Sequence, residues 1–209
     1  ALGGGPNKGE RHWKEVLSLL CLNSETVGFF FANFATGAGM SLVENLFFLF
    51  YKNEVGASAV LCGVSVVITV IVELPIFASG RYLLRRVGIM PLMLISQLAY
   101  SSRAIGYTLI PDPALILALE PLHGVTYGTM QIASVDYMAT IAPKGLEASA
   151  QGLLAAFNRG LGFLVGTIVG GFVMQNYGSK IMFTGAAALV AFSGALYAGC
   201  WVLTRKCGL

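Results

Sequence analysis

Six long stretches of the chain consist almost entirely of apolar residues, and short polar segments separate them. Their approximate bounds are 26–50, 57–80, 89–110, 113–137, 148–175 and 181–204. A helix rises about 1.5 Å per residue, so each stretch is long enough to cross a hydrocarbon core about 30 Å thick. No stretch alternates between apolar and polar residues with a period of two, as the strands of a membrane barrel would. The pattern predicts an all-α membrane protein with six transmembrane helices in one bundle, residues 26–204.

Shorter segments flank this bundle. Residues 1–11 are polar and glycine-rich, which predicts a flexible linker. Residues 12–25 begin with an apolar stripe, which predicts an amphipathic helix at the membrane surface followed by a connector. The stripe comprises Trp13, Val16, Leu17 and Leu20. Residues 205–209 form a short tail, and because the sequence begins with a linker-like segment and not with Met, we expect a fragment of a longer protein.

Composition supports the membrane assignment. Of the 209 residues, 56% are hydrophobic and 11% are charged, whereas soluble domains carry about 25% charged residues. Nine of the 13 Lys and Arg residues lie on the side of the predicted bundle that holds its N-terminus, and Lys52 and Lys180 lie on the other side. The positive-inside rule therefore predicts that both termini of this segment are cytoplasmic. The basic residues form no single patch, so a nucleic-acid partner is not expected.

Motifs for soluble chemistry are missing from the sequence. The four cysteines have no zinc or disulfide spacing, and there is no phosphate-binding glycine loop or dinucleotide fingerprint. The two histidines, His12 and His123, cannot form a metal site together. We expect neither an enzyme nor a bound cofactor or metal.

Charged residues inside the apolar stretches are the main candidates for function. Each of the first five stretches contains one: Glu44, Glu73, Arg103, Glu120 and Arg159. An unpaired charge at the centre of a membrane helix costs at least about 2.5 kcal/mol, so such residues usually pair or line a polar pathway. Structural ion pairs that hold the bundle together are the alternative interpretation.

The depth of these charges predicts which of them meet. At about 1.5 Å per residue, Glu44, Arg103 and Glu120 each lie about 9–10 Å from the outer ends of their helices. They could share one layer, with Arg103 as the charge partner of Glu120. Arg159 and Glu73 lie nearer the inner ends and predict a second pair near a gate. Three carboxylates against two guanidiniums leave one carboxylate without a partner, and in a low-dielectric site it could hold a proton at neutral pH.

Polar residues at helical spacing predict a lined cavity. In the stretch 113–137, one face presents Glu120, His123, Tyr127, Gln131 and Ser134. Further polar faces comprise Ser58, Cys62, Ser65, Thr69 and Glu73 in the second stretch and Ser96, Tyr100, Arg103 and Tyr107 in the third. We expect Glu120 with His123 to form a proton site, and Tyr100, Tyr107, Tyr127 and Gln131 to line the cavity. Contact between helices is the alternative for each face.

The fifth stretch has a different pattern. Gly162, Gly166 and Gly170 recur every four residues, the spacing that lets two membrane helices touch closely. This predicts a packing face and not a ligand site.

Several segments resemble the C-terminal half of a major facilitator superfamily transporter. They are VENLFFLF, VELPIF, GRYLLRRVG, AYSSRAIGY, LEPLHGVTYG and APKGLEASAQGLLAAFNRGLGFLVGTIVGG, in the expected order. The likeness covers about residues 13–204 and is greatest to the lactose-permease-like and nucleoside–proton-symporter-like branch, which includes the macrophage MHC class I receptor homologue group. GRYLLRRVG resembles the superfamily's signature loop, but Leu83 and Leu84 stand where that loop has an acidic residue, which puts its gating salt bridge in doubt.

The resemblance implies that the six spans are helices seven to twelve of a twelve-helix bundle. It also implies a central cavity completed by an N-terminal six-helix half, with alternating access by rocking of the halves. Glu73, Arg103, Glu120 and His123 stand in helices that carry proton coupling in the sugar–proton symporters. Their role is transferred as a hypothesis only, because Glu precedes His here.

Together these observations predict a multi-pass transporter in the lipid bilayer. The function they favour is proton-coupled symport of a small polar organic solute. The alternative is a receptor or scaffold that keeps the transporter fold without transport. The short outer segments argue against a large extracellular binding surface, and the intramembrane charges favour transport.

Overall fold

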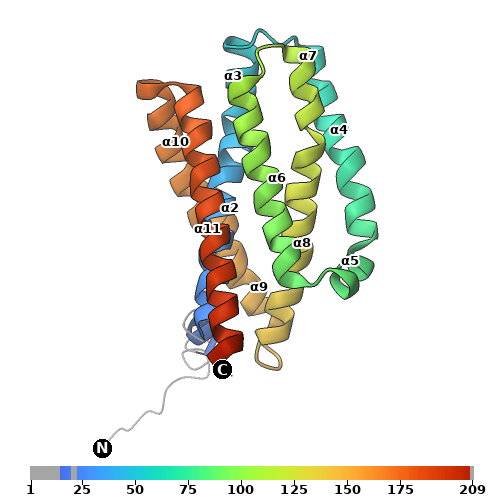
Figure 1. Cartoon of the computed structure of the whole chain (residues 1–209), viewed down its shortest axis with the longest axis vertical. Helices are drawn as coiled ribbons and strands as arrows, with labels where there is room; N and C mark the ends of the chain where they lie inside the picture. Colours follow the sequence, from blue (N-terminus) through green and yellow to red (C-terminus); the bar gives the residue numbers. More distant parts are fainter. Residues whose placement is uncertain (1–14, 20–22, 208–209) are drawn as a thin grey trace, which may run out of the picture.

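The computed structural model describes residues 15–19 and 23–207, and all regular structure in this part of the chain is helical. Figure 1 shows long helices that run side by side between two ends of a bundle. The predicted linker 1–11 lies outside the described residues, as do Trp13 and Leu20 of the predicted surface helix. Residues 15–18 of that predicted helix are helical, and Val16 is buried.

The helices follow one another with short connections. Their bounds are α2 (Ser24–Asn45), α3 (Phe47–Asn53), α4 (Ala59–Ala78), α5 (Gly80–Arg86), α6 (Ile89–Leu109), α7 (Pro113–Ile116), the 3₁₀ turn η2 (Leu117–Leu119), α8 (Pro121–Ile141), α9 (Glu147–Ala155), the π-helical segment η3 (Ala156–Gly162), α10 (Phe163–Tyr177) and α11 (Ser179–Cys207).

Local sequence explains where several helices begin and end. The Asn23 side chain accepts a hydrogen bond from the Thr26 amide at 2.8 Å, and Asp112 accepts one from the Ala114 amide at 2.7 Å. These side chains satisfy amides that have no partner inside the first helical turn. Gly178 separates α10 from α11 with a φ of 88°, a conformation that favours glycine.

The predicted stretches and the observed helices differ in five places. The stretch 113–137 is not one helix, because it is divided among α7, η2 and α8. The stretch 26–50 is interrupted at Leu46, and the connector after the second stretch forms α5. The stretch 148–175 includes the π segment η3. The last helix is longer than its predicted stretch, because α11 continues into the predicted tail as far as Cys207.

Within the described residues, four segments are long and apolar enough to cross a membrane. They are Ser24–Asn53, Ala59–Ala78, Glu147–Tyr177 and Ser179–Arg205. α6 and α8 have 21 residues each and run alongside these helices in Figure 1, but their sequences are less apolar. Six membrane-spanning helices therefore stay a prediction.

α6 lies between α8 and α11 in the bundle. α6 packs against α8 and α11, and α2 packs against α11, α10 and η3. α4 packs mainly against α8, at the edge of the bundle. Two apolar cores form, one around Phe47, Tyr107 and Phe183 and the other around Phe29 and Tyr137.

The glycine face predicted in the fifth stretch is confirmed as a packing face. A Cβ atom at Gly166 would lie 2.2 Å from the Ala38 carbonyl oxygen, and one at Gly162 would lie 2.8 Å from the Phe34 carbonyl oxygen. These distances are too short for any side chain, so the glycines allow backbone contact between α2 and the η3–α10 segment.

Gly166→Ala is expected to lower the stability of the protein by about 1–3 kcal/mol, because the added methyl group must push α10 away from α2. Gly171→Ala is the matched control, since a Cβ at Gly171 meets nothing within 4 Å. The midpoint of thermal unfolding in detergent measures both variants. Equal midpoints for the two would contradict the close contact.

Candidate functional site

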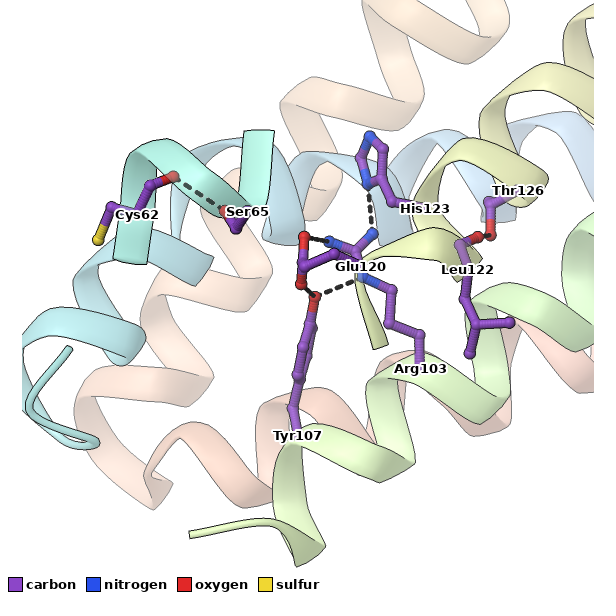
Figure 2. A network of polar contacts seen from close by, with 8 residues as sticks. All are labelled: Cys62, Ser65, Arg103, Tyr107, Glu120, Leu122, His123 and Thr126. Carbon is purple, nitrogen blue, oxygen red and sulfur yellow. Dashed lines mark hydrogen bonds and ion pairs between the residues drawn. The ribbon is translucent and has the colours of Figure 1, made fainter. Parts of the chain in front are cut away.

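Arg103 lies at the centre of a buried polar network, and its side chain is 2% exposed. It projects from α6 toward the junction between η2 and α8, as Figure 2 shows. Its Nη2 donates to Glu120 Oε2 at 3.2 Å, and its Nη1 contacts His123 Nδ1. Its Nε donates to the Tyr107 hydroxyl. One guanidinium therefore joins three side chains, and its charge is balanced by the buried Glu120 carboxylate.

The hydrogen bonds assign the protonation of this network. The Tyr107 hydroxyl accepts from Arg103, so its own hydrogen is free to be donated to Glu120 Oε1 at 2.7 Å. Both carboxylate oxygens of Glu120 then accept hydrogen bonds, as an ionised carboxylate does. A guanidinium can only donate, so the contact fits a His123 that accepts at Nδ1. This arrangement of donors and acceptors is the one that a carboxylate and a neutral imidazole make around a guanidinium.

An interruption of the helix places Glu120 in this network. Pro121 has no amide hydrogen and starts α8 at its first position, where proline is well tolerated. The preceding residues tighten into η2, and the Glu120 amide donates to the Leu117 carbonyl at 3.2 Å. Glu120 therefore sits between two helices and not within one.

Aromatic rings pack against Tyr107. Its ring stacks on Phe47 with centroids 4.7 Å apart and meets Phe183 edge-on at 5.2 Å. The Arg103 guanidinium lies 5.2 Å from the Tyr107 ring centroid and 5.8 Å from that of Phe47. Such contacts favour a cation that has little water around it. The rings therefore fix both the hydroxyl and the guanidinium that hold Glu120.

The network opens on a pocket of about 310 Å³. α2 and α3 supply one wall, α4 supplies another, and Arg103, Glu120 and His123 form the polar floor. The wall residues are Val43, Glu44, Phe47, Phe48, Ser65, Val66 and Thr69. A cavity with apolar walls and a few convergent polar groups is the usual form of a small-molecule site.

A second ion pair lies at the edge of this pocket. Arg159 of η3 donates to both carboxylate oxygens of Glu44, at 3.1 and 3.3 Å, and both side chains are partly exposed. The guanidinium lies between two rings, 5.1 Å from the centroid of Tyr127 and 4.9 Å from that of Phe163. The rings limit the directions in which Arg159 can point.

The predicted pairing of Arg159 with Glu73 is wrong in this structure. Arg159 pairs with Glu44, and among the described residues Glu73 takes part in no ion pair. The expectation that Glu44, Arg103 and Glu120 meet in one layer agrees with the pocket, which all three residues line. Of the three carboxylates, Glu73 is the one to which the described part of the chain supplies no cationic partner.

The predicted cavity-lining residues have different positions. Tyr100 is fully buried, and its hydroxyl donates to the Gly39 carbonyl at 2.8 Å. Tyr107 is also buried, and its hydroxyl donates to Glu120. Neither ring lines the pocket. Tyr127 contacts Arg159, and Gln131 is half-buried away from the pocket lining.

Sequence reasoning missed the phenylalanines of the pocket wall, Phe47 and Phe48. In the sequence they stand in an unbroken apolar run, VENLFFLF, which marks a buried or lipid-facing helix and nothing more specific. Their spacing of three and four residues after Glu44 was the available signal, because it places them on the face of Glu44.

Tyr107→Phe is expected to destabilise the protein by about 1–3 kcal/mol, because it leaves the buried Arg103 Nε and Glu120 Oε1 each without a partner. Tyr100→Phe is the control: it removes one buried hydroxyl, but the Gly39 carbonyl lies inside α2 and keeps its helical hydrogen bond. Thermal unfolding of the two variants should show the larger loss for Tyr107→Phe. A larger loss for Tyr100→Phe would contradict the assigned network.

Comparison with known families gives an independent result. A family model described as "MFS_1 like family" matches residues 5–185. The match includes both ion pairs and every residue of the pocket lining.

Individual relatives are more distant. The chain is 27% identical to the "Uncharacterized transporter YwbF" of Bacillus subtilis over 135 residues, which cover 65% of this chain and 34% of the relative. It is 24% identical to "Maltose permease" of Geobacillus stearothermophilus over 139 residues, 66% of this chain and 35% of the relative. It is 28% identical to "Multi-drug resistance efflux pump PmrA" of Streptococcus pneumoniae over 177 residues, 83% of this chain and 42% of the relative. The matched part spans about a third to two fifths of the length of these relatives.

Proposed function

The chain belongs to the MFS_1-like family of the major facilitator superfamily, and from this premise we propose that it forms the C-terminal six-helix half of a transporter that moves a small polar organic solute together with protons. It is a multi-pass integral membrane protein. In this proposal α6 and α8 cross the membrane beside the four more apolar segments. Their polar residues face the interior of the bundle: Arg103 and Ser96 of α6 and Ser134 of α8 are all buried.

The distribution of basic residues supports an orientation with both ends of the bundle segment in the cytoplasm. α5, with Arg81, Arg85 and Arg86, lies at the lower end of Figure 1, where α11 also ends. α3, with Lys52, lies at the opposite end. An excess of Arg and Lys marks the cytoplasmic side of a membrane protein.

The observation that carries the proposal is the buried Arg103–Glu120 pair on the floor of the pocket. A proton that binds Glu120 removes the negative charge that balances Arg103, and a buried guanidinium without a counter-ion costs several kcal/mol. Arg103 must then leave Glu120 for another acceptor, such as a solute hydroxyl in the pocket. Protonation and solute binding are therefore linked through one guanidinium.

His123 extends this linkage. Because its Nδ1 accepts from Arg103, it can take up a second proton only after Arg103 has moved. We propose that His123 shares the coupling proton with Glu120 once the Arg103–Glu120 pair has opened. While the pair is closed, Nδ1 of His123 accepts from Arg103 and cannot bind that proton.

The full-length protein in sealed liposomes tests the proposal. A panel of sugars, nucleosides and amino acids would be added outside, with solute uptake and proton movement recorded together. We expect one class of solute to enter and to draw protons with it. Solute uptake without proton movement would mean that the protein is a transporter whose solute movement is not coupled to protons. No flux of any solute through folded protein would favour a non-transporting receptor or scaffold.

A further inference from the structure

The charge of the pocket floor changes when Glu120 binds a proton. The Arg103 and Glu120 side chains are 2% and 3% exposed and balance each other. The contact with His123 fits a neutral imidazole, which adds no charge. Tyr107 donates to Glu120, whereas Tyr51 of α3 donates to a backbone carbonyl at 2.6 Å. The floor is therefore neutral while Glu120 is ionised, and it carries one net positive charge once Glu120 is protonated.

The other carboxylates near the pocket are not placed to balance that charge. Glu44 faces the pocket from α2, but both its oxygens accept from Arg159, at 3.1 and 3.3 Å. Glu73 of α4 is not among the residues that line the pocket. In the described part of the chain, protonation of Glu120 therefore leaves Arg103 as a buried cation whose counter-ion must come from a bound molecule.

A carboxylate meets this need better than a neutral group. A hydroxyl or amide oxygen accepts one hydrogen bond from Arg103 but brings no negative charge, and a buried guanidinium without a counter-ion is strongly destabilising. A solute carboxylate brings the charge that Glu120 has lost, and hydrogen bonds between ionised groups are about twice as strong as neutral ones. Its oxygens can accept from Arg103 Nη2 and from a new O–H at Glu120 Oε2. Glu120 Oε1 keeps its hydrogen bond from Tyr107.

The walls that this half supplies suit an apolar solute body. They are formed largely by Val43, Phe47, Phe48 and Val66. The Ser65 hydroxyl donates to a carbonyl of its own helix at 3.0 Å, so its hydrogen is not available to a solute. Solute hydroxyls against these side chains would lose their hydrogen bonds to water without finding partners. The site therefore favours a single polar group at the floor over a solute with many hydroxyls.

We propose that the solute of this site is a small monocarboxylate with an apolar body, which binds together with one proton. Its carboxylate takes the place of Glu120 as the counter-ion of Arg103, and the proton resides on Glu120 Oε2, between the two carboxyl groups. Solute and proton together add no net charge to the buried floor. This inference rests on the proposed function, because it takes this pocket as the solute site and Glu120 as the proton site.

Isothermal titration calorimetry of the purified full-length protein in detergent tests the inference without transport. The probes are propionate, hexanoate and phenylacetate, each with its amide and its primary alcohol. At least one carboxylate should bind at least about tenfold more tightly than its two neutral analogues, because only the carboxylate balances Arg103. Titrations in two buffers with different ionisation enthalpies should show that about one proton is taken up for each carboxylate bound. The inference is overturned if no carboxylate binds, if a neutral analogue binds as tightly, or if no proton is taken up.

Glu120→Gln separates the proton from the charge. Arg103 then lacks its counter-ion at every pH, so the carboxylate should bind without proton uptake and, at neutral pH, about tenfold more tightly than to the parent, which must first protonate Glu120. Arg103→Met combined with Glu120→Gln should bind the carboxylate no better than its amide. Glu147→Gln is the matched control, because Glu147 is exposed at the start of α9, and it should behave as the parent does. Proton uptake in Glu120→Gln equal to that of the parent would overturn the assignment.

The liposome experiment fails or succeeds independently. Carboxylate binding with proton uptake but without flux would support the binding site and contradict transport. Proton-coupled flux of a sugar or nucleoside, with no carboxylate bound, would support the proposed function and overturn the monocarboxylate.

Discussion

Arg103→Met is expected to cost about 3–5 kcal/mol of folding stability, among the largest effects of any single substitution in this chain. The methionine keeps most of the length and apolar surface of the side chain, so the loss comes from the network. Glu120 would remain buried without its cation, and His123 would lose the donor at Nδ1. Tyr107 alone cannot stabilise an ionised carboxylate in an apolar core. The midpoint of thermal unfolding of the purified protein in detergent measures the loss.

The double variant Arg103→Met with Glu120→Gln separates charge balance from packing. It removes both charges at once, and replacing a whole buried ion pair often costs little. We expect it to recover more than half of the stability lost in Arg103→Met, while coupled transport stays absent. A double variant as unstable as the sum of the two single variants would show that the two side chains act independently, contrary to their 3.2 Å contact.

The helical architecture could be predicted from apolar stretches alone, but the interruptions could not. Length and hydropathy do not distinguish a straight helix from one that restarts, so the stretch 113–137 was predicted as a single helix. Pro121 was the visible signal for a break, because a proline inside a helix removes a hydrogen bond and here begins a new helix. The π segment at Ala156–Gly162, which packs against α2, has no comparable signal in the sequence.

The sequence could predict how deep each charged residue of the candidate site lies along its helix. It could not predict which way the side chain points around the helix axis. Counting residues along each helix correctly brought Arg103 and Glu120 to one level, and the structure joins them. The same counting paired Arg159 with Glu73, because depth says nothing about which way a side chain points around the helix axis. Tyr100 shares a face with Arg103 as predicted, but that face is covered by α2, whose Gly39 leaves room for the ring. Which neighbour covers a face is a property of the packed bundle.

Glu120→Gln is expected to abolish proton movement during solute uptake while solute exchange across the membrane continues. Glutamine has the shape of a protonated glutamate, and its carbonyl oxygen can still accept from the Tyr107 hydroxyl. It can neither gain nor lose a proton, so a cycle that returns the empty carrier through a deprotonated Glu120 would stop. Exchange of labelled for unlabelled solute needs no net proton transfer and should persist. The variant leaves Arg103 unbalanced, so its folding must be checked by thermal unfolding before transport is measured.

Glu147→Gln is the matched control, because Glu147 is exposed at the start of α9 and its carboxylate accepts from the nearby Gly145 amide. Its proton movement and its exchange should both equal those of the parent protein in the same liposomes. Glu120→Gln should differ from it in proton movement alone, since the solute pocket retains its walls and its other two floor residues. If folded Glu120→Gln still moves protons with solute, the coupling proton must reside on another carboxylate of the site, and Glu73, which has no ion pair among the described residues, is the one to substitute next. If exchange is lost together with proton movement, Glu120 binds the solute directly and the carboxylate serves both ligands in turn.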